Sequence, residues 1–315
     1  MKRLIIGSYT AEMGGTGQGL SVVPGDTIAT PAPSFAIAEG PFLYATNELQ
    51  SGSVSSFRLS GDGRLEHLST QPTDGVWPCH LAWHDGHLLV ANYGSGRITV
   101  LPVDADGIIG ERTDLVQHEG RGVNPERQDG PHAHQVQVAP DGTVTVVDLG
   151  IDRLLQYRLE DGRLHRIGEI EVPAGAGPRH YVVHPDGRWF VSAELGSAVL
   201  TVVDGAYTGS TPATTSDVLN QPSAIALSAD ARYVYLANRG AETVSVFRVG
   251  DELGFVGEVS CGGAWPRDMV VDDDRLIVAN QKSNSVVTFR LGPDGMPVPT
   301  GEVIETGSPT SVLAV

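Results

Sequence analysis

The sequence predicts an all-β fold: a seven-bladed β-propeller with four antiparallel strands in each blade. A unit of about 45 residues recurs along the 315-residue chain, and each unit holds short apolar strands separated by turns. The chain also begins and ends with the two halves of one such unit. A β-sandwich or barrel has similar strand content, but it explains neither a fixed period nor a split unit.

The first strand of each repeat opens near a proline. The seven prolines are Pro33, Pro78, Pro131, Pro178, Pro222, Pro266 and Pro309. Their spacing is regular, and only the interval that ends at Pro131 is clearly longer. Regular spacing of this length indicates one supersecondary unit per repeat.

The second strand of each repeat is an apolar run that ends in a turn with Asn, Asp or Glu. The six complete runs are 43–48, 88–93, 144–149, 189–194, 234–239 and 276–281. Asp-Gly pairs at 85–86, 141–142 and 186–187 precede three of them, as tight hairpin turns require. Alternating strands follow most of the runs, which completes a four-stranded antiparallel unit.

The two ends of the chain supply the seventh blade. Residues 310–315 repeat the first strand of the unit, and residues 4–9 repeat the second strand. We therefore expect the N- and C-terminal strands to pair and close the ring, which removes a free sheet edge. Residues 1–315 would then form one domain.

Charge and composition exclude several kinds of partner. The net charge is −17, and a groove for nucleic acid needs clustered Lys and Arg instead. An acidic surface also disfavours binding to anionic membranes. The two cysteines, Cys79 and Cys261, lie in different repeats, so no disulfide framework is indicated. No long apolar run or signal-peptide pattern is present, and we expect a cytoplasmic protein that is a monomer or a weak oligomer.

Two aligned positions in the repeats are expected to face the central channel. The residues that follow the prolines are Ser34, Cys79, His134, Arg179, Ser223, Arg267 and Thr310. The residues that follow the second strands are Tyr9, Glu48, Tyr93, Leu149, Glu194, Arg239 and Gln281. Because the first strands line the channel of a propeller, we expect the charged members to meet at one mouth of it.

The long interval inserts residues 120–130 immediately before His132-Ala133-His134. An insertion beside a channel more often builds a site than a spacer, so we expect it to roof the mouth. The alternative is an ordinary solvated loop.

Several motifs resemble the lactonase family of seven-bladed β-propellers. They are Arg127-Gln128 followed by 130–134, then 177–180, 184–187 with Glu194-Leu195, 238–240 and 265–268. The resemblance extends over essentially the whole chain. It implies a site that needs no metal and no cofactor and that contains His134, Arg179, Glu194 and one or both of Arg239 and Arg267.

Hydrolysis of a lactone needs a base for water and donors for the developing oxyanion. The sequence leaves His134 or Glu194 as the base and favours His134, because a neighbouring arginine should keep Glu194 ionised. Arg179 is the expected oxyanion partner, and its structural alternative is a simple ion pair with Glu194. The expected substrate-binding residues are Arg239, Arg267, His132, Arg127 and His180. No Gly-x-Ser-x-Gly motif is present, which argues against an acyl-enzyme.

The resemblance and the arginines together predict a hydrolase that opens an anionic sugar-acid lactone, with 6-phosphogluconolactone as the leading substrate. One alternative is a lyase or isomerase that uses the same site to close a lactone ring, as muconate-lactonizing enzymes do. Another is a propeller that only binds a partner, because fold alone does not fix function.

Overall fold

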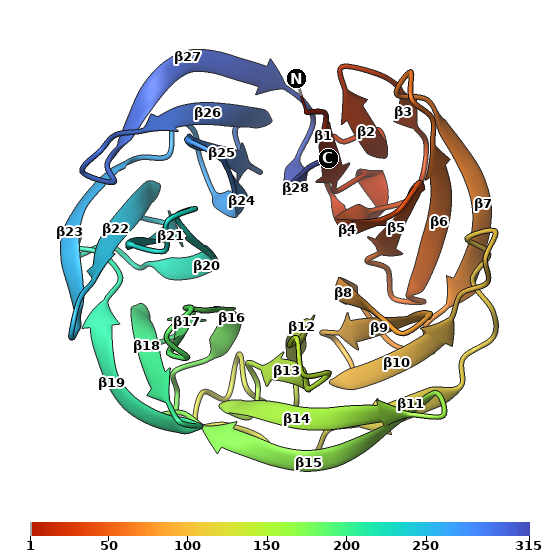
Figure 1. Ribbon diagram of the computed structural model, residues 1–315, viewed down its shortest axis with the longest axis horizontal. Coiled ribbons are helices and arrows are strands. Elements are labelled where there is room, and N and C mark those ends of the chain that lie inside the picture. Colours follow the sequence, from red (N-terminus) through yellow and green to blue (C-terminus); the bar gives the residue numbers. More distant parts are fainter. Residues whose placement is uncertain (1) are drawn as a thin grey trace.

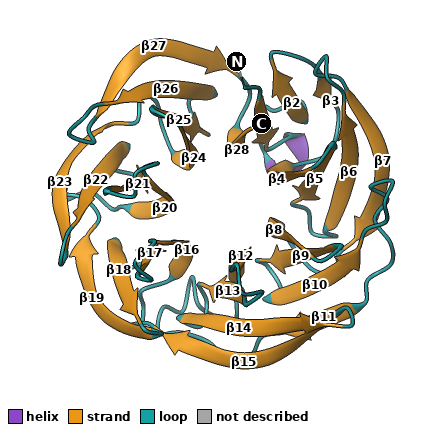
Figure 2. Ribbon diagram, viewed as in Figure 1, coloured by secondary structure: helices purple, strands orange, loops and turns teal. Residues whose placement is uncertain are grey.

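The computed structural model describes residues 2–315 as a ring of seven four-stranded antiparallel sheets around a central opening (Figure 1). Nearly all the regular structure is strand, and within residues 2–315 the one helix is the short 3-10 turn η1 (Ala11–Met13) (Figure 2). No helix in this part of the chain is long and apolar enough to cross a membrane. The predicted propeller, its blade number and its strand count are confirmed.

The six continuous blades follow one another around the ring. The first three contain β4 (Pro33–Glu39), β5 (Phe42–Asn47), β6 (Ser53–Leu59) and β7 (Leu65–Pro72); β8 (Pro78–His84), β9 (His87–Asn92), β10 (Arg97–Pro102) and β11 (Asp114–Gln117); and β12 (Ala133–Val138), β13 (Val144–Asp148), β14 (Arg153–Glu160) and β15 (Arg163–Glu171). The next three contain β16 (Pro178–Val183), β17 (Trp189–Ala193), β18 (Ala198–Val203) and β19 (Ala206–Pro212); β20 (Gln221–Leu227), β21 (Tyr233–Arg239), β22 (Thr243–Val249) and β23 (Leu253–Ser260); and β24 (Pro266–Asp272), β25 (Arg275–Asn280), β26 (Ser285–Leu291) and β27 (Pro297–Glu305).

The closing blade is assembled from both ends of the chain, in the order β28 (Pro309–Ala314), β1 (Leu4–Ser8), β2 (Leu20–Val23) and β3 (Thr27–Ile28). Ile6 pairs with Val312, and Arg3 and Val315 exchange two backbone hydrogen bonds of 2.9 Å. The two ends therefore lie side by side in Figure 1. The predicted closure of the ring by non-covalent strand pairing is confirmed.

The hydrophobic core lies between neighbouring blades. On one side of the closing blade, Ile6 and Val312 pack against Ile277 of the preceding blade. On its other side, Ile5 joins a cluster that includes Phe57 of the following blade. Because each sheet buries both faces against its neighbours, the second strands are mostly apolar and almost entirely buried, as the sequence pattern predicts.

The outermost strands lie at the rim of the ring, where they are half exposed. On β15, for example, Leu164 and Ile170 are buried, whereas Arg163, His165 and Glu169 are exposed. Charged side chains on such exposed strands oppose pairing with the edge of another molecule.

The blade after the long interval begins later than expected. Its first strand starts at Ala133, and not at Pro131, because the backbone N–H of His132 donates to the Asp148 carboxylate (2.7 Å) instead of joining the ladder. His134 is therefore the second residue of its strand, as Arg179 is in the next blade.

Substitution of Val312 by Asp should open the ring. Val312 is buried between two blades, so a carboxylate there has no partner, and we expect the free energy of unfolding to fall by roughly 3 kcal/mol. Urea unfolding, monitored by circular dichroism, measures this free energy. The control, Val298→Asp, alters a 55% exposed residue on β27 and should change stability by less than about 0.5 kcal/mol. Equal stability of both variants would contradict closure through β28.

Candidate active site

One backbone hydrogen bond, repeated around the ring, brings the two channel-facing positions together. In six blades the residue after the second strand donates its N–H to the carbonyl of a residue just before the first strand. The pairs are Tyr9 to Ser308, Glu48 to Ala32, Tyr93 to Trp77, Leu149 to His132, Glu194 to Gly177 and Gln281 to Trp265, at 2.8 to 3.0 Å. Side chains from both rows therefore leave the backbone at the same level of the channel.

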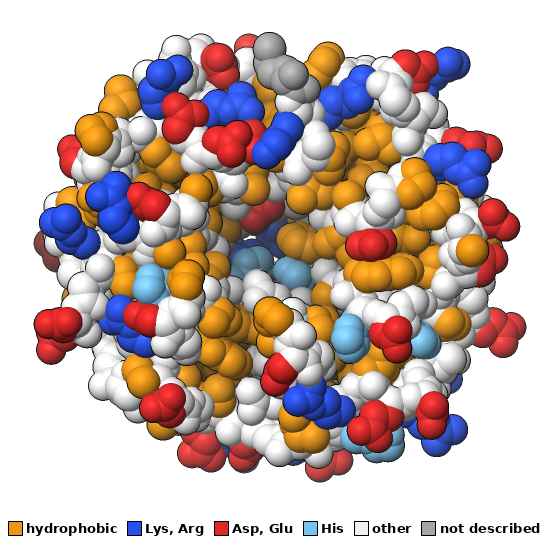
Figure 3. Space-filling model, viewed as in Figure 1, with side chains coloured by type: hydrophobic (Ala, Val, Ile, Leu, Met, Phe, Trp, Pro, Cys, Tyr) orange, Lys and Arg blue, Asp and Glu red, His pale blue; other side chains and the backbone are white. Residues whose placement is uncertain are grey.

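These side chains form a pocket of about 240 Å³ at the channel mouth. It is lined by Tyr9, Met13, Glu48, Trp77, Cys79, Tyr93, Arg127, His134, Glu194, Arg239 and Arg267. A much smaller space of about 10 Å³ is lined by Arg179, His180 and Asp268 among others, and it shares Cys79, His134 and Arg267 with the pocket. Figure 3 shows basic and histidine side chains at the floor of the central opening.

Glu194 is the centre of the pocket's charge network. Arg127 Nη2 lies 2.6 Å from its Oε1, Arg239 Nη2 lies 2.5 Å from its Oε2, and Arg179 Nε lies 3.3 Å from its Oε2. The Glu194 side chain is only 3% exposed, and burial alone would raise its pKa. The three guanidinium groups outweigh burial and lower the pKa to about 2. Glu194 is therefore an ionised counter-ion for three arginines.

Arg127 reaches this network because the insertion folds into a self-contained turn. Within that turn the Gln128 N–H donates to the Asn124 carbonyl (2.8 Å), and the buried Gln128 amide donates to the Leu149 carbonyl (2.9 Å). These bonds fix the turn to the end of β13 and aim Arg127 at Tyr93 and Glu194. Of the segment 120–130, only Arg127 lines the pocket.

Arg179 is fully surrounded by protein and incompletely bonded. Its side chain is 3% exposed, and neither Nε nor Nη1 has a hydrogen-bond partner within residues 2–315. Burial, with Arg239 next, lowers its pKa to about 9, while Glu194 opposes the shift. A buried guanidinium with unused donors is costly, which is typical of a group reserved for a ligand.

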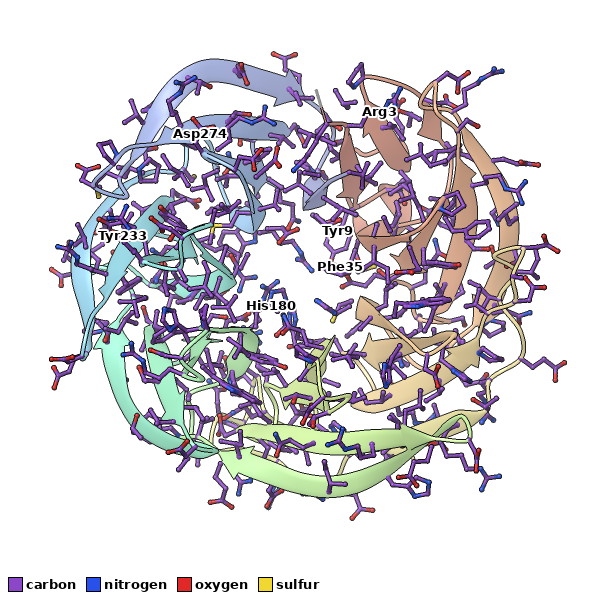
Figure 4. All side chains as sticks on the ribbon, viewed as in Figure 1. Arg3, Tyr9, Phe35, His180, Tyr233 and Asp274 are labelled. Carbon is purple, nitrogen blue, oxygen red and sulfur yellow. The ribbon has the colours of Figure 1, made fainter. Side chains whose placement is uncertain are left out.

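A second network joins three blades on the other side of the pocket. Arg267 Nη2 donates to the Tyr9 hydroxyl (2.6 Å), and that hydroxyl donates to Glu48 Oε1 (2.6 Å). The Arg267 guanidinium also lies over the Tyr9 ring, 4.7 Å from its centroid. Figure 4 shows Tyr9, Phe35 and His180 pointing into the central opening.

His134 lies between the two networks. Its ring contacts Tyr93 and His180 edge-on, with centroids 5.6 and 5.1 Å apart, and Nδ1 is 3.9 Å from Cys79 Sγ. Burial, followed by the charge of Arg179, lowers the pKa of His134 well below its usual range. The imidazole is therefore neutral at pH 7.

The structure brings most of the expected residues together. His134, Glu194, Arg239, Arg267 and Arg127 line the pocket, while Arg179 and His180 line the small space that adjoins it. His132 does not line either space; its ring stacks on Tyr93 and its Nδ1 meets the Tyr93 carbonyl at 2.9 Å.

The site residues predicted from the sequence did not include six others that line the pocket: Tyr9, Met13, Glu48, Trp77, Cys79 and Tyr93. Four of the six (Tyr9, Glu48, Cys79 and Tyr93) belong to the two aligned rows, and that position was the available signal. Trp77 precedes its proline, and nothing in its sequence context indicated that its side chain turns to the channel mouth.

The pocket is positively charged although the protein is acidic. Across the pocket and the small space beside it, four arginines (Arg127, Arg179, Arg239 and Arg267) face three carboxylates (Glu48, Glu194 and Asp268), a surplus of one positive charge in a chain of net charge −17. A more voluminous pocket, about 970 Å³ between the closing blade and β27, is lined by a single charged residue, Glu305. Within residues 2–315, no group of three or more His, Cys, Asp or Glu is arranged to hold a metal ion.

Known proteins match this chain over essentially its whole length. Residues 3–314 match the family model described as "Lactonase, 7-bladed beta-propeller". The 6-phosphogluconolactonase of Bacillus subtilis is 37% identical over 256 residues, which is 76% of this chain and 73% of that protein. The solved structure of a periplasmic gluconolactonase from Pseudomonas aeruginosa superposes with a TM-score of 0.90 at 27% identity, over 100% of this chain and 99% of that one.

Substitution of Glu194 by Gln should destabilise the fold. Three guanidinium groups, two of them buried, would lose their counter-ion, and we expect a loss of roughly 3–5 kcal/mol at pH 7 in urea unfolding. The pKa of Glu194 is lower in the folded chain, so its stabilisation is present above about pH 4.5 and lost as the pH falls towards 2. The difference in the free energy of unfolding between the wild type and Glu194→Gln should therefore shrink as the pH falls from about 4.5 towards 2.

The matched control is Glu171→Gln, which breaks the exposed pair of Arg153 and Glu171 (2.8 Å) and should cost less than about 1 kcal/mol. A Glu194→Gln protein as stable as the control at pH 7 would show that the network does not depend on this charge.

Proposed function

The chain belongs to the lactonase family of seven-bladed β-propellers, and from that premise we propose that it is a hydrolase that opens a sugar-acid lactone, with 6-phosphogluconolactone as its substrate. The observation that carries the proposal is the arginine cluster at the channel mouth, where four guanidinium groups outnumber the three carboxylates around them. A phosphate group on the substrate would supply the negative charge that this cluster lacks.

Substrate binding rests on the more accessible arginines. Arg127 and Arg267 have side chains 32% and 16% exposed, and a guanidinium binds phosphate through two parallel hydrogen bonds. Trp77 is 38% exposed at the rim, where its ring offers an apolar face to the carbons of the sugar. A local cluster of this kind draws in an anion that the net charge of −17 would otherwise repel.

Arg179 is placed to stabilise the reacting carbonyl. As water adds to the lactone carbon, the carbonyl oxygen becomes an oxyanion, and preorganised donors lower the energy of that state. The unpartnered Nη1 of Arg179 supports this role, because a donor without a bond in the free protein gains one only when the ligand is present. Ionised Glu194 acts as a positioning residue that holds Arg179 beside Arg239.

His134 is proposed to orient the attacking water. It is neutral at pH 7, so it can accept a hydrogen bond, and it lines both the pocket and the space beside Arg179. Buried among arginines, its imidazolium form is disfavoured.

We propose that catalysis needs no metal ion. We also propose that the enzyme works in the cytoplasm, because a phosphorylated sugar acid does not diffuse across membranes, and that it is a monomer or a weak oligomer.

The wild-type protein should open 6-phosphogluconolactone with kcat/KM roughly 10²–10³ times that for gluconolactone, because only the former presents a phosphate to the arginines. A pH-stat, corrected for spontaneous hydrolysis, measures acid release from a panel of lactones with and without EDTA. Activity that disappears with EDTA and returns with calcium would contradict the metal-independent mechanism. A complete lack of activity on every lactone would overturn the function.

Substitution of Arg179 by Ala should lower kcat by roughly 10²–10³-fold, because an oxyanion donor acts mainly in the transition state. His134→Ala should lower it by about 10- to 100-fold without moving KM more than about threefold. Arg163→Ala, at an exposed position on β15, is the control and should leave steady-state kinetics unchanged. Full turnover in Arg179→Ala would remove this residue from the reaction.

A further inference from the structure

Proton transfer from water requires a base, and the two groups that the sequence suggested for that role are poorly suited to it. Three guanidinium groups surround Glu194 and stabilise its carboxylate, so it accepts a proton only in strong acid. His134 is buried among Arg179, Arg267 and Arg239, which oppose a further positive charge. A different group in the pocket must take the proton.

Glu48 is the other carboxylate in the pocket, and its surroundings differ from those of Glu194. It directly follows β5, and its backbone N–H donates to the Ala32 carbonyl (2.9 Å), which sets it at the level of the channel mouth. Its side chain is 8% exposed. The nearest cation is Arg267, whose Nη2 lies 3.7 Å from Oε2, beyond hydrogen-bond distance.

The two oxygens of Glu48 are in different states. Oε1 accepts the Tyr9 hydroxyl at 2.6 Å, while Oε2 is buried and has no hydrogen-bond partner within residues 2–315. A buried carboxylate oxygen that accepts no hydrogen bond costs free energy, and an acceptor of this kind is typical of a group that bonds to a ligand or to a reacting water. Oε2 is therefore free to accept a proton.

Tyr9 fixes this asymmetry. Arg267 donates to the phenol oxygen at 2.6 Å, so the phenol proton is directed to Glu48 Oε1. Burial raises the pKa of Tyr9 well above its usual range, although Arg267 opposes the shift, so Tyr9 stays a donor. The titratable groups that face Glu48 are thus Tyr9 after β1, Cys79 on β8 and Arg267 on β24.

We propose that Glu48 is the general base of the reaction, an inference that rests on the proposed lactone hydrolysis. Glu48 Oε2 takes a proton from water as the water oxygen bonds to the lactone carbon, and the carbonyl π electrons move to the oxygen that faces Arg179. When the tetrahedral species collapses, that electron pair re-forms the carbonyl and the bond from carbon to the ring oxygen breaks. The ring oxygen keeps the bonding pair and takes the proton back from Glu48, and the carboxylic acid product ionises to solvent.

The test is Glu48→Gln, which keeps an oxygen for Tyr9 but removes the base. We expect kcat on 6-phosphogluconolactone to fall by roughly 10²–10⁴-fold, with KM within about threefold. Glu66→Gln, at an exposed residue on β7 of the same blade, is the matched control and should keep wild-type kinetics. Thermal unfolding of each variant monitors the fold.

A second variant separates a chemical role from a structural one. In Glu48→Ala, added formate should restore turnover in proportion to its concentration, because it replaces the missing carboxylate. Formate should not accelerate the wild type or Glu66→Gln. Wild-type kcat in Glu48→Gln would overturn the proposal, and so would a loss in Glu48→Ala that formate does not restore. Inactivity of the wild type on all lactones would instead overturn the proposed function, and this inference with it.

Discussion

The ionised Glu194 carboxylate is the interaction on which the site depends. It ties Arg127 of the insertion, Arg179 of β16 and Arg239 of β21 to one point, so three segments are joined by one counter-ion. Four guanidinium groups of like charge would otherwise repel one another in a buried pocket. Because Glu194 balances only part of that charge, the pocket keeps a surplus for an anionic ligand. The contacts of Glu194 therefore stabilise the channel mouth and still leave positive charge there for an anionic ligand.

The closed ring makes this convergence possible. The pocket collects side chains from blades far apart in the sequence, and their distances are fixed only if the ring cannot open. Pairing of β1 with β28 supplies that constraint, and it brings Tyr9 from one end of the chain beside Arg267, near the other end. Asp268, adjacent to Arg267, accepts the Val312 N–H (2.9 Å), so β24 is bonded directly to the closing strand. The residues that close the ring are therefore next to the residues that form the pocket.

The repeat period predicted the blades, the split closing blade and the two rows that face the channel, because each is a property of position in the unit. The sequence predicted that Arg179 lies beside Glu194, because both belong to one blade. It did not predict that Arg239 of the next blade and Arg127 of the insertion contact the same carboxylate, since those contacts join side chains from different segments. Glu48 and Glu194 occupy equivalent places in two blades. Glu194 nevertheless contacts three guanidinium groups, whereas Glu48 accepts a hydrogen bond from the Tyr9 phenol. Arg127 was suggested by family resemblance alone. Its arrival in the pocket depends on the turn that Asn124 and Gln128 form, which has no periodic signal.

The turn that leads into the first strand explains how one scaffold presents such different chemistry. The residue before the proline has a left-handed φ in several blades, including Trp77 (52°) and Trp265 (63°), which bulky side chains rarely adopt. Its recurrence makes this strain a feature of the blade and not a local accident. The carbonyl of that residue accepts the N–H from the end of the second strand, so both channel positions are set by the backbone. A single substitution at either position then changes the chemistry of the mouth, and the glutamates and arginines of this site all lie at such positions except Arg127.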